Sequence, residues 1–294
     1  MDKNAINYPL QISWLMPLAP SEDPCLLTGT LNCLAHQTLQ ANELIIAADG
    51  ALPDALLSVI AACNLPWQLL CQSHNQGIGA TLARVAPLCQ GEFIVRIDSD
   101  DLYAPEHTEA VVNALRTEPK LGAVGCQLLE LDMDRSRRTS ARITPTNIEE
   151  AMRWLPWRNP LNHQTVALRR QALVDAGGYR HCPAFEDWDL WFRIAAAGYH
   201  LNNLPGCTAA ARVNSRHRQR RHGWRYSLRE CRFYGRQIKE GRLGLGVAML
   251  ACLSRLPWRL LPAPLLAWWM QSALRGSPPF NTTWLTQLLA EPTG

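Results

Sequence analysis

The acidic run Asp98–Asp101 (DSDD) carries the most distinctive chemistry in the sequence. It follows Glu92–Ile97, an apolar run of a length typical of a buried strand. Alternation along an extended backbone places Asp98 and Asp100 on the same side. Two such carboxylates can hold a hard cation, Mn²⁺ or Mg²⁺, whose other ligands are phosphate oxygens. The competing interpretation is a solvated acidic turn, or a helix cap before Leu102.

A second acidic pair, Glu186-Asp187, stands at the start of a predicted helix, Phe185–Gly198. Apolar side chains recur within it at helical spacing, and Gly198 suits the C-cap. The helix dipole favours acidic residues at an N-terminus, which gives the pair a purely structural explanation. The functional alternative is a carboxylate base that takes a proton from an attacking hydroxyl.

Alternating strand-like and helix-like patterns fill the first hundred residues and predict an α/β fold. The predicted strands are Gln11–Met16, Glu43–Ala48, Trp67–Gln72 and Glu92–Ile97, and the predicted helices are Pro24–Gln37, Leu52–Cys63 and Gly77–Cys89. Right-handed βαβ units of this kind form a largely parallel sheet, and ligands bind beyond the carboxyl ends of its strands. Asp49 follows the second strand and Asp98 the fourth, so the topology brings both to one edge.

The remaining chain divides by composition. Glu130–Thr146 is polar and is predicted to be a surface loop, and Asn162–Arg169 is predicted to be a strand that His163 opens. From Arg212 onward there are 14 basic and 3 acidic residues, a net charge of +11, whereas residues 1–211 hold 15 basic and 22 acidic residues, a net charge of −7. We therefore expect an acidic catalytic body, 1–211, and a basic, amphipathic helical region, 212–294.

The cysteines and the N-terminus indicate a cytoplasmic protein. None of the ten cysteines forms a CxxC pair, which is atypical of a zinc cluster or a disulfide framework and typical of free thiols. Met1–Pro9 is polar and lacks the basic, apolar and small-residue regions of a signal peptide.

Five stretches, in this order, resemble the family 2 glycosyltransferases with the A-type fold, particularly bacterial enzymes of surface-polysaccharide and lipopolysaccharide assembly. They are ISWLMPL (Ile12–Leu18), HQTLQANELIIAADG (His36–Gly50), NQGIGATLARVAPLCQGEFIVRIDSDD (Asn75–Asp101), NHQTVALRR (Asn162–Arg170) and GGYRHCPAFEDWDLWFRIAAAGY (Gly177–Tyr199). The resemblance implies a nucleotide-binding, Rossmann-like mixed sheet, mainly parallel. It also implies a nucleotide-binding half at about 1–101 and an acceptor half at about 102–211.

On the donor side, the resemblance implies a nucleotide diphosphate sugar as substrate. Asp49 stands where a carboxylate contacts the base or ribose. Asp98 and Asp100 stand at the motif that binds the metal ion and the diphosphate. Arg96 either faces the nucleotide or forms an ion pair at the edge of the core.

On the acceptor side, the resemblance implies an inverting displacement by a hydroxyl of a glycan or a lipid-linked acceptor. Asp187 stands at the position of the catalytic base, with Glu186 nearby for the acceptor or the sugar. His163 is either a sugar contact or a structural histidine.

Four alanines depart from the family pattern. Ala48 replaces the first of two consecutive acids, Ala51 a serine, Ala83 an asparagine of the following helix, and Ala211 a tyrosine. These changes leave the carboxylates of the motifs in place and weaken any inference about which nucleotide binds.

The C-terminal region combines a basic stretch, Arg212–Arg242, with an apolar stretch, Leu243–Met270, that three prolines interrupt. This pattern predicts peripheral attachment to the cytoplasmic face of the inner membrane. The expected contacts are Arg216, Arg218, Arg220, Arg221, Arg225, Arg229 and Arg232 with headgroups, and Trp258, Trp268, Trp269, Leu260, Leu261, Leu265 and Leu266 below them. The alternatives are a solvated basic helix and a helical hairpin packed on the body; no nucleic-acid partner is expected.

Two other functions compete with sugar transfer. A nucleotidyltransferase needs a glycine-rich basic loop near its N-terminus, and Ile12–Pro20 contains no glycine, lysine or arginine. An inactive nucleotide-sugar-binding or membrane adaptor protein is consistent with Ala48 and Ala83. Retention of the acidic motifs argues against it.

Overall fold

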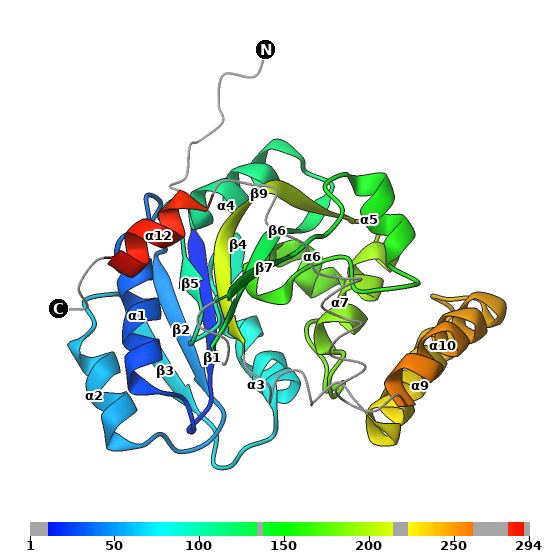
Figure 1. Ribbon diagram of the computed structural model, residues 1–294, viewed down its shortest axis with the longest axis horizontal. Coiled ribbons are helices and arrows are strands. Elements are labelled where there is room, and N and C mark those ends of the chain that lie inside the picture. Colours follow the sequence, from blue (N-terminus) through cyan, green and yellow to red (C-terminus); the bar gives the residue numbers. More distant parts are fainter. Residues whose placement is uncertain (1–10, 134–137, 214–222, 261–281, 291–294) are drawn as a thin grey trace.

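The computed structural model describes residues 11–133, 138–213, 223–260 and 282–290, which form a mixed sheet with helices on both faces (Figure 1). The strands are β1 (Ile12–Leu18), β2 (Glu43–Ala48), β3 (Trp67–Cys71), β4 (Phe93–Arg96), β5 (Leu102–Tyr103), β6 (Leu121–Asp132), β7 (Arg138–Arg142), β8 (Ala167–Arg169) and β9 (His200–Val213). The helices are α1 (Pro24–Ala35), α2 (Asp54–Ala62), α3 (Ile78–Val85), α4 (His107–Thr117), α5 (Ile148–Trp154), α6 (Arg170–Asp175), α7 (Glu186–Ala196), α9 (Trp224–Lys239), α10 (Leu245–Leu260) and α12 (Thr283–Ala290), with 3₁₀ turns η1 (Ala86–Leu88) and η2 (His163–Thr165).

The N-terminal half is a parallel sheet, as the sequence predicts. Its strands lie in the order β3-β2-β1-β4, and β1 pairs in parallel with both β2 and β4. All seven residues of β1 are buried, which explains why it reads as a continuous apolar run rather than an alternating one. Because β2 and β4 flank β1 with the same direction, Asp49 and Asp98 emerge at the same edge of the sheet.

The C-terminal half continues the sheet with mixed pairing. After β4 the order is β8-β6-β9-β5: β8 runs antiparallel to β4 and β6, whereas β9 runs parallel to β6. Two predictions fail here. Glu130–Thr146 is not only a loop, because β7, although largely polar in sequence, pairs antiparallel with the end of β6. Asn162–Arg169 is strand only over β8, because the chain first makes the turn η2.

Helix α7 is the element that carries the predicted base, and it is almost entirely enclosed. Seven of its eleven residues are buried, including Trp188, Trp191 and Phe192. Gly198, just beyond its end, has φ of +90°, so the predicted C-terminal glycine is confirmed.

The C-terminal region packs on the catalytic body, which is the hairpin alternative for this region. Helix α9 buries Tyr226, Phe233 and Tyr234 against Phe185 and Trp188, with the Phe233 and Trp188 ring centroids 4.8 Å apart. Helix α10 packs on α9. Helix α12 contacts β9, where the Trp284 indole N–H donates to the Cys207 carbonyl oxygen at 3.0 Å, and it appears on the opposite side of the view from α9 (Figure 1). Within the described residues, no helix has both the length and the apolar character needed to span a membrane.

Candidate active site

Three carboxylates gather directly after β4, at the edge of the sheet where Asp49 also lies. One ligand oxygen from each of Asp98, Asp100 and Asp101 lies within 4.8 Å of the others. The strand ends before Asp98, so a turn over residues 99–100, rather than strand alternation, makes the side chains converge. Thr30 on α1 stabilises this turn by donating its hydroxyl to the carbonyl oxygens of Ser99 and Asp101, at 3.0 and 2.7 Å.

The acidic cluster has the electrostatics of a cation site. Burial, followed by the charges of Asp98 and Glu22, raises the pKa of Asp100 to about 7. Burial and the charge of Asp100 raise the pKa of Asp101 well above its usual range. Oδ2 of Asp101 is buried and has no hydrogen-bond partner among the described residues. Three hard oxygen donors at this spacing fit Mn²⁺ or Mg²⁺, since a cation would relieve the repulsion and give the buried oxygen a ligand.

Arg96 supplies positive charge beneath the cluster. Its side chain is 2 % exposed, and Nη1 lies 2.6 Å from Oδ1 of Asp98. Of the two arrangements considered for Arg96, facing the nucleotide or forming an ion pair at the edge of the core, the structure has the ion pair. Tyr103 fixes the backbone of the same turn, because its hydroxyl accepts the Asp98 N–H at 2.8 Å and donates to the Gln164 carbonyl at 3.2 Å.

Arg212 joins the acidic turn from the far end of β9. Its Nη1 donates to the Asp100 carbonyl oxygen at 2.5 Å, and its backbone N–H donates to Oδ1 of Asp101 at 3.3 Å. Neither Arg212 nor Asp101 is among the predicted site residues. Asp101 could have been recognised as the last member of the acidic run, whereas the contact of Arg212 spans more than a hundred residues and leaves no local signal.

Asp49 organises the loop that enters α3. Its Oδ1 accepts the Gln76 N–H at 2.8 Å and its Oδ2 accepts the Gly77 N–H at 3.0 Å. Gly77 is the residue before α3, with φ of +88°, so the carboxylate satisfies backbone donors at a helix start. This contact gives Asp49 a definite structural role at the edge where a nucleotide would bind.

The predicted base, Asp187, lies in the first turn of α7 and is half-buried. Its Oδ1 accepts the Trp188 N–H at 2.7 Å, and its Oδ2 accepts the Asn159 side-chain N–H at 2.5 Å. Asn159 is a further residue that sequence reasoning missed, because the contact joins a loop after α5 to a helix 28 positions later.

Helices α3 and α7 meet at Gly79 and Glu186. A Cβ on Gly79 would lie 3.0 Å from Glu186 Cβ and 3.2 Å from the Arg180 carbonyl oxygen, so glycine permits this close approach. The contact brings Glu186 against α3, which packs on β1 and β2 in the half of the sheet that carries Asp49.

Tyr179 is buried and lies within hydrogen-bond distance of His163. Burial raises the pKa of Tyr179, and the nearby charges of Arg96, Asp187 and Glu186 all act on it. The Tyr179 hydroxyl lies 2.9 Å from Nε2 of His163. Burial, with the charge of Arg96 adding to it, lowers the pKa of His163 well below its usual range. The hydrogen bond to Tyr179 gives His163 a structural role.

Sequence comparisons identify the family of the chain. The family model of glycosyl transferase family 2 matches residues 20–178. An uncharacterised glycosyltransferase of Haemophilus influenzae is 30 % identical over 90 % of this chain and 100 % of its own length. The amylovoran biosynthesis glycosyltransferase AmsE of Erwinia amylovora is 28 % identical over 90 % of this chain and 99 % of its own. The UDP-Gal:alpha-D-GlcNAc-diphosphoundecaprenol beta-1,3-galactosyltransferase of Escherichia coli is 23 % identical over 86 % and 92 %.

Solved structures confirm the fold. The mannosyltransferase PcManGT of Pyrobaculum calidifontis, in complex with GDP-Man and Mn²⁺, superposes with a TM-score of 0.60 at 18 % identity, covering 96 % of this chain and 84 % of that one. TarS of S. aureus superposes with a TM-score of 0.58 at 17 % identity, covering 85 % of this chain and 43 % of that one. The A-type fold expected from the sequence is thus found, and with the family match over more than half of the chain it settles the assignment: this protein belongs to glycosyl transferase family 2.

Proposed function

We propose that this glycosyltransferase is metal-dependent and inverting, and that it moves a sugar from a nucleotide diphosphate sugar to an acceptor hydroxyl. The observation that carries the proposal is the acidic turn after β4, where ligand oxygens of Asp98, Asp100 and Asp101 lie within 4.8 Å of one another. The donor half then comprises residues of about 1–101, and the acceptor half residues of about 102–211. Region 212–294 is an extension of this body.

On the donor side, Asp98, Asp100 and Asp101 would hold Mn²⁺ or Mg²⁺. When bound, a divalent cation supplies positive charge that stabilises the departing diphosphate. Arg96 orients Asp98 through their 2.6 Å ion pair. Asp49 shapes the loop before α3 through its two backbone hydrogen bonds, and it lines the edge where the nucleotide base or ribose would lie.

On the acceptor side, Asp187 accepts the proton of the attacking hydroxyl while that oxygen bonds to the anomeric carbon. The bond from this carbon to the diphosphate oxygen breaks on the opposite face, so the configuration inverts in one displacement. General-base assistance of this kind contributes about 10²–10⁴-fold. Glu186, one residue away, lies against α3 and is placed to contact the transferred sugar or the acceptor.

Two relatives support a proposal for the acceptor class. One acts in amylovoran biosynthesis and another on a diphosphoundecaprenol-linked sugar. We infer a glycan or lipid-linked acceptor of bacterial surface-polysaccharide or lipopolysaccharide assembly, and a position at the cytoplasmic face of the inner membrane.

Helix α10 supports this location. It buries Ala248 and Ala251, yet Leu245, Leu250 and Leu253 are each about 60 % exposed. An apolar face turned outward, together with the exposed cations Arg225, Arg229 and Arg232 of α9, suits an anionic lipid surface. The other predicted lipid contacts lie outside the described residues or on side chains that the structure does not describe.

The test is a transfer assay with a panel of nucleotide sugars, Mn²⁺ and a lipid-linked sugar acceptor. We expect metal-dependent transfer whose product has the opposite anomeric configuration to the donor, read by NMR coupling constants. Asp187→Asn should retain donor binding by calorimetry and lose most of the transfer. Retention of configuration would refute the inverting displacement. Donor binding by the wild type with no transfer to any acceptor would favour the adaptor alternative.

A further inference from the structure

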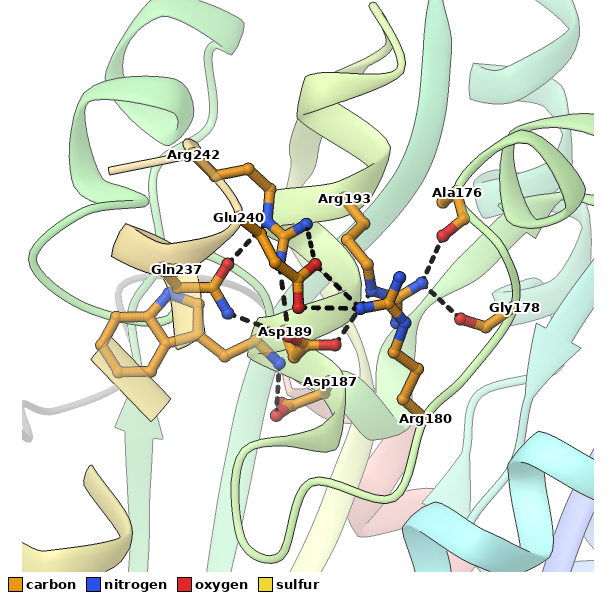
Figure 2. A network of polar contacts seen from close by, with 10 residues as sticks. Ala176, Gly178, Arg180, Asp187, Asp189, Arg193, Gln237, Glu240 and Arg242 are labelled. Atoms are coloured by element: carbon orange, nitrogen blue, oxygen red, sulfur yellow. Dashed lines mark hydrogen bonds and ion pairs between the residues drawn. The ribbon is translucent and has the colours of Figure 1, made fainter. Parts of the chain in front are cut away.

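A buried carboxylate joins α7 to the C-terminal hairpin formed by α9 and α10 (Figure 2). Asp189 on α7 is 0 % exposed. Its Oδ2 accepts a hydrogen bond from Arg193 Nε at 2.9 Å, and its Oδ1 accepts one from Gln237 Nε2 of α9 at 2.9 Å. Gln237 is itself 0 % exposed, and its Oε1 accepts Arg242 Nε at 2.7 Å. The amide is thereby fixed with its N–H groups toward Asp189.

The same cluster holds the segment that leads into α7. Arg193 Nη1 donates to the carbonyl oxygens of Ala176 and Gly178, which follow the end of α6. Glu240, just after α9, pairs with Arg242 at 2.5 Å and with Arg180 at 2.9 Å. Figure 2 shows these contacts converging around Asp189. The hairpin therefore contacts both α7 and the segment between α6 and α7.

This arrangement bears on the proposed base because Asp187 and Asp189 share one helical turn. Two residues along an α-helix correspond to about 200° of rotation, so the two carboxylates leave opposite sides of α7. The apolar contacts of Trp188 and Phe192 are non-directional. The Trp188 indole N–H adds one directional contact, a hydrogen bond to the Leu155 carbonyl oxygen at 2.9 Å. A buried charge bound by oriented donors is directional, and it restricts rotation and sliding of the helix.

We propose that Asp189, Gln237 and Arg242 are positioning residues, through which the C-terminal hairpin sets the rotation of α7 and places Asp187 for proton removal. The inference rests on the function proposed above. It assigns the hairpin a part in catalysis that is separate from any contact with a membrane.

The test compares full-length Gln237→Met with the wild type. Methionine keeps the length and apolar volume of the side chain and removes both amide contacts. We expect kcat to fall about ten- to hundredfold, as for a small misplacement of a reacting group. KM and Kd for the donor should stay within about twofold, because the donor side does not touch this cluster. Hydrogen exchange of the backbone amides in the first turn of α7 should become faster.

The matched control is Gln171→Met on α6. It removes an exposed hydrogen bond of the same kind, from Gln171 Nε2 to Asp175 Oδ1 at 2.8 Å, and should leave kcat and exchange unchanged. All rates are taken well below each unfolding midpoint and divided by the folded fraction from circular dichroism. If Gln237→Met does not fold, Arg242→Lys serves in its place, because it removes the fork that binds both Gln237 and Glu240.

Two outcomes for Gln237→Met would overturn the proposal. One is a kcat per folded molecule equal to that of the wild type, and the other is a loss of kcat without faster hydrogen exchange in α7. Asp187→Asn is measured in the same assay to separate the two hypotheses. If Asp187→Asn transfers at the wild-type rate, the base assignment fails. The exchange comparison still decides whether Gln237 orders the first turn of α7.

Discussion

The side-chain amide of Asn159 donates a hydrogen bond to Oδ2 of Asp187, with 2.5 Å between the nitrogen and the oxygen. The carbonyl end of the same amide accepts the Leu161 N–H at 3.2 Å, which determines the end of the amide that faces Asp187. Oδ1 of Asp187 accepts the Trp188 N–H. Both carboxylate oxygens of the proposed base are therefore oriented by neighbouring groups before an acceptor binds.

Asn159→Ala should lower kcat about ten- to hundredfold and leave donor affinity unchanged. A hydrogen bond to a charged group contributes about 1.5–3 kcal/mol, and here its loss releases one oxygen of the base. Steady-state transfer and calorimetry with the nucleotide sugar measure the two quantities. Asn113→Ala, at an exposed position of α4, is the control and should leave both kcat and donor affinity unchanged. Transfer by Asn159→Ala at the wild-type rate would show that the orientation of Asp187 does not limit the reaction.

The parallel half of the sheet and its acidic edge were predictable because each element is local. Strands β1, β2 and β4 are continuous apolar runs, and the residues just after β2 and β4 are the carboxylates that the topology brings together. The spacing within α7 likewise predicts the buried face and the position of Asp187.

The contacts missed are those that join distant segments. Arg212 reaches Asp100 across 112 positions, and Gln237 reaches Asp189 across 48. Nothing in the local pattern distinguishes these residues from others in a basic stretch. The β6–β7 pairing was missed for a related reason, because polar residues in a strand that pairs at the edge resemble a loop.

The carboxylates of the acidic turn should lower the stability of the metal-free protein, and Asp100→Asn tests this. The pKa of Asp100 is about 7 in the folded protein against a usual 3.8. Between these values the unfolded chain releases a proton that the folded chain retains, so the metal-free protein loses stability as pH rises through this window. At pH 8, Asp100→Asn should therefore unfold at a higher temperature than the metal-free wild type, by about 2–4 °C for each kcal/mol of repulsion relieved.

Manganese should reverse the order of the two proteins. Saturating Mn²⁺ should raise the unfolding midpoint of the wild type and barely change that of Asp100→Asn, because a ligand stabilises only the state that binds it. Differential scanning fluorimetry with and without EDTA gives both midpoints. Asp54→Asn, an exposed carboxylate on α2, should behave as the wild type. An equal manganese shift in Asp100→Asn would remove this residue from the cation site.

His107 should make the protein sensitive to acid. Burial lowers the pKa of this ring to about 3 from a usual 6.5. Its Nδ1 lies 2.7 Å from Thr208 Oγ1, and Nε2 is buried with no partner among the described residues, so a second ring proton has no acceptor there. As pH falls below 6.5 the unfolded chain binds a proton that the folded chain excludes, and stability falls until the folded pKa is reached.

This single histidine should cost about 2 kcal/mol of stability between pH 7 and pH 5. Urea unfolding of wild type and His107→Gln at the two pH values gives the difference, which should be smaller in the variant by that amount. His36 is exposed, so His36→Gln is the control. It should show the same difference in stability between pH 7 and pH 5 as the wild type. Identical pH dependence in wild type and His107→Gln would mean that the ring is not held neutral.

The outward face of α10 is the feature that should bind a membrane. Leu245, Leu250 and Leu253 are each about 60 % exposed, although leucine is a residue that folding normally buries. The helix cannot turn this face inward, because Arg255 is held by Glu230 at 2.6 Å and lies over the Trp188 ring on the inner side. Transfer of each leucine to an apolar phase contributes about 1.5–3 kcal/mol, and each nearby cation adds about 1 kcal/mol on an anionic surface.

Full-length protein should therefore sediment with vesicles that contain anionic lipid and much less with neutral ones, and high salt should release part of it. The double variant Leu250→Ser/Leu253→Ser should bind the anionic vesicles at least about tenfold less, since it removes two apolar contacts. Leu57→Ser, at an exposed position of α2, is the matched control and should sediment as the wild type. A chain ended after Val213 is not a suitable comparison, because it would uncover Phe185 and Trp188, which α9 covers. If the wild type binds neither kind of vesicle and forms a dimer that the double variant cannot form, this face binds a second copy of the chain instead of lipid.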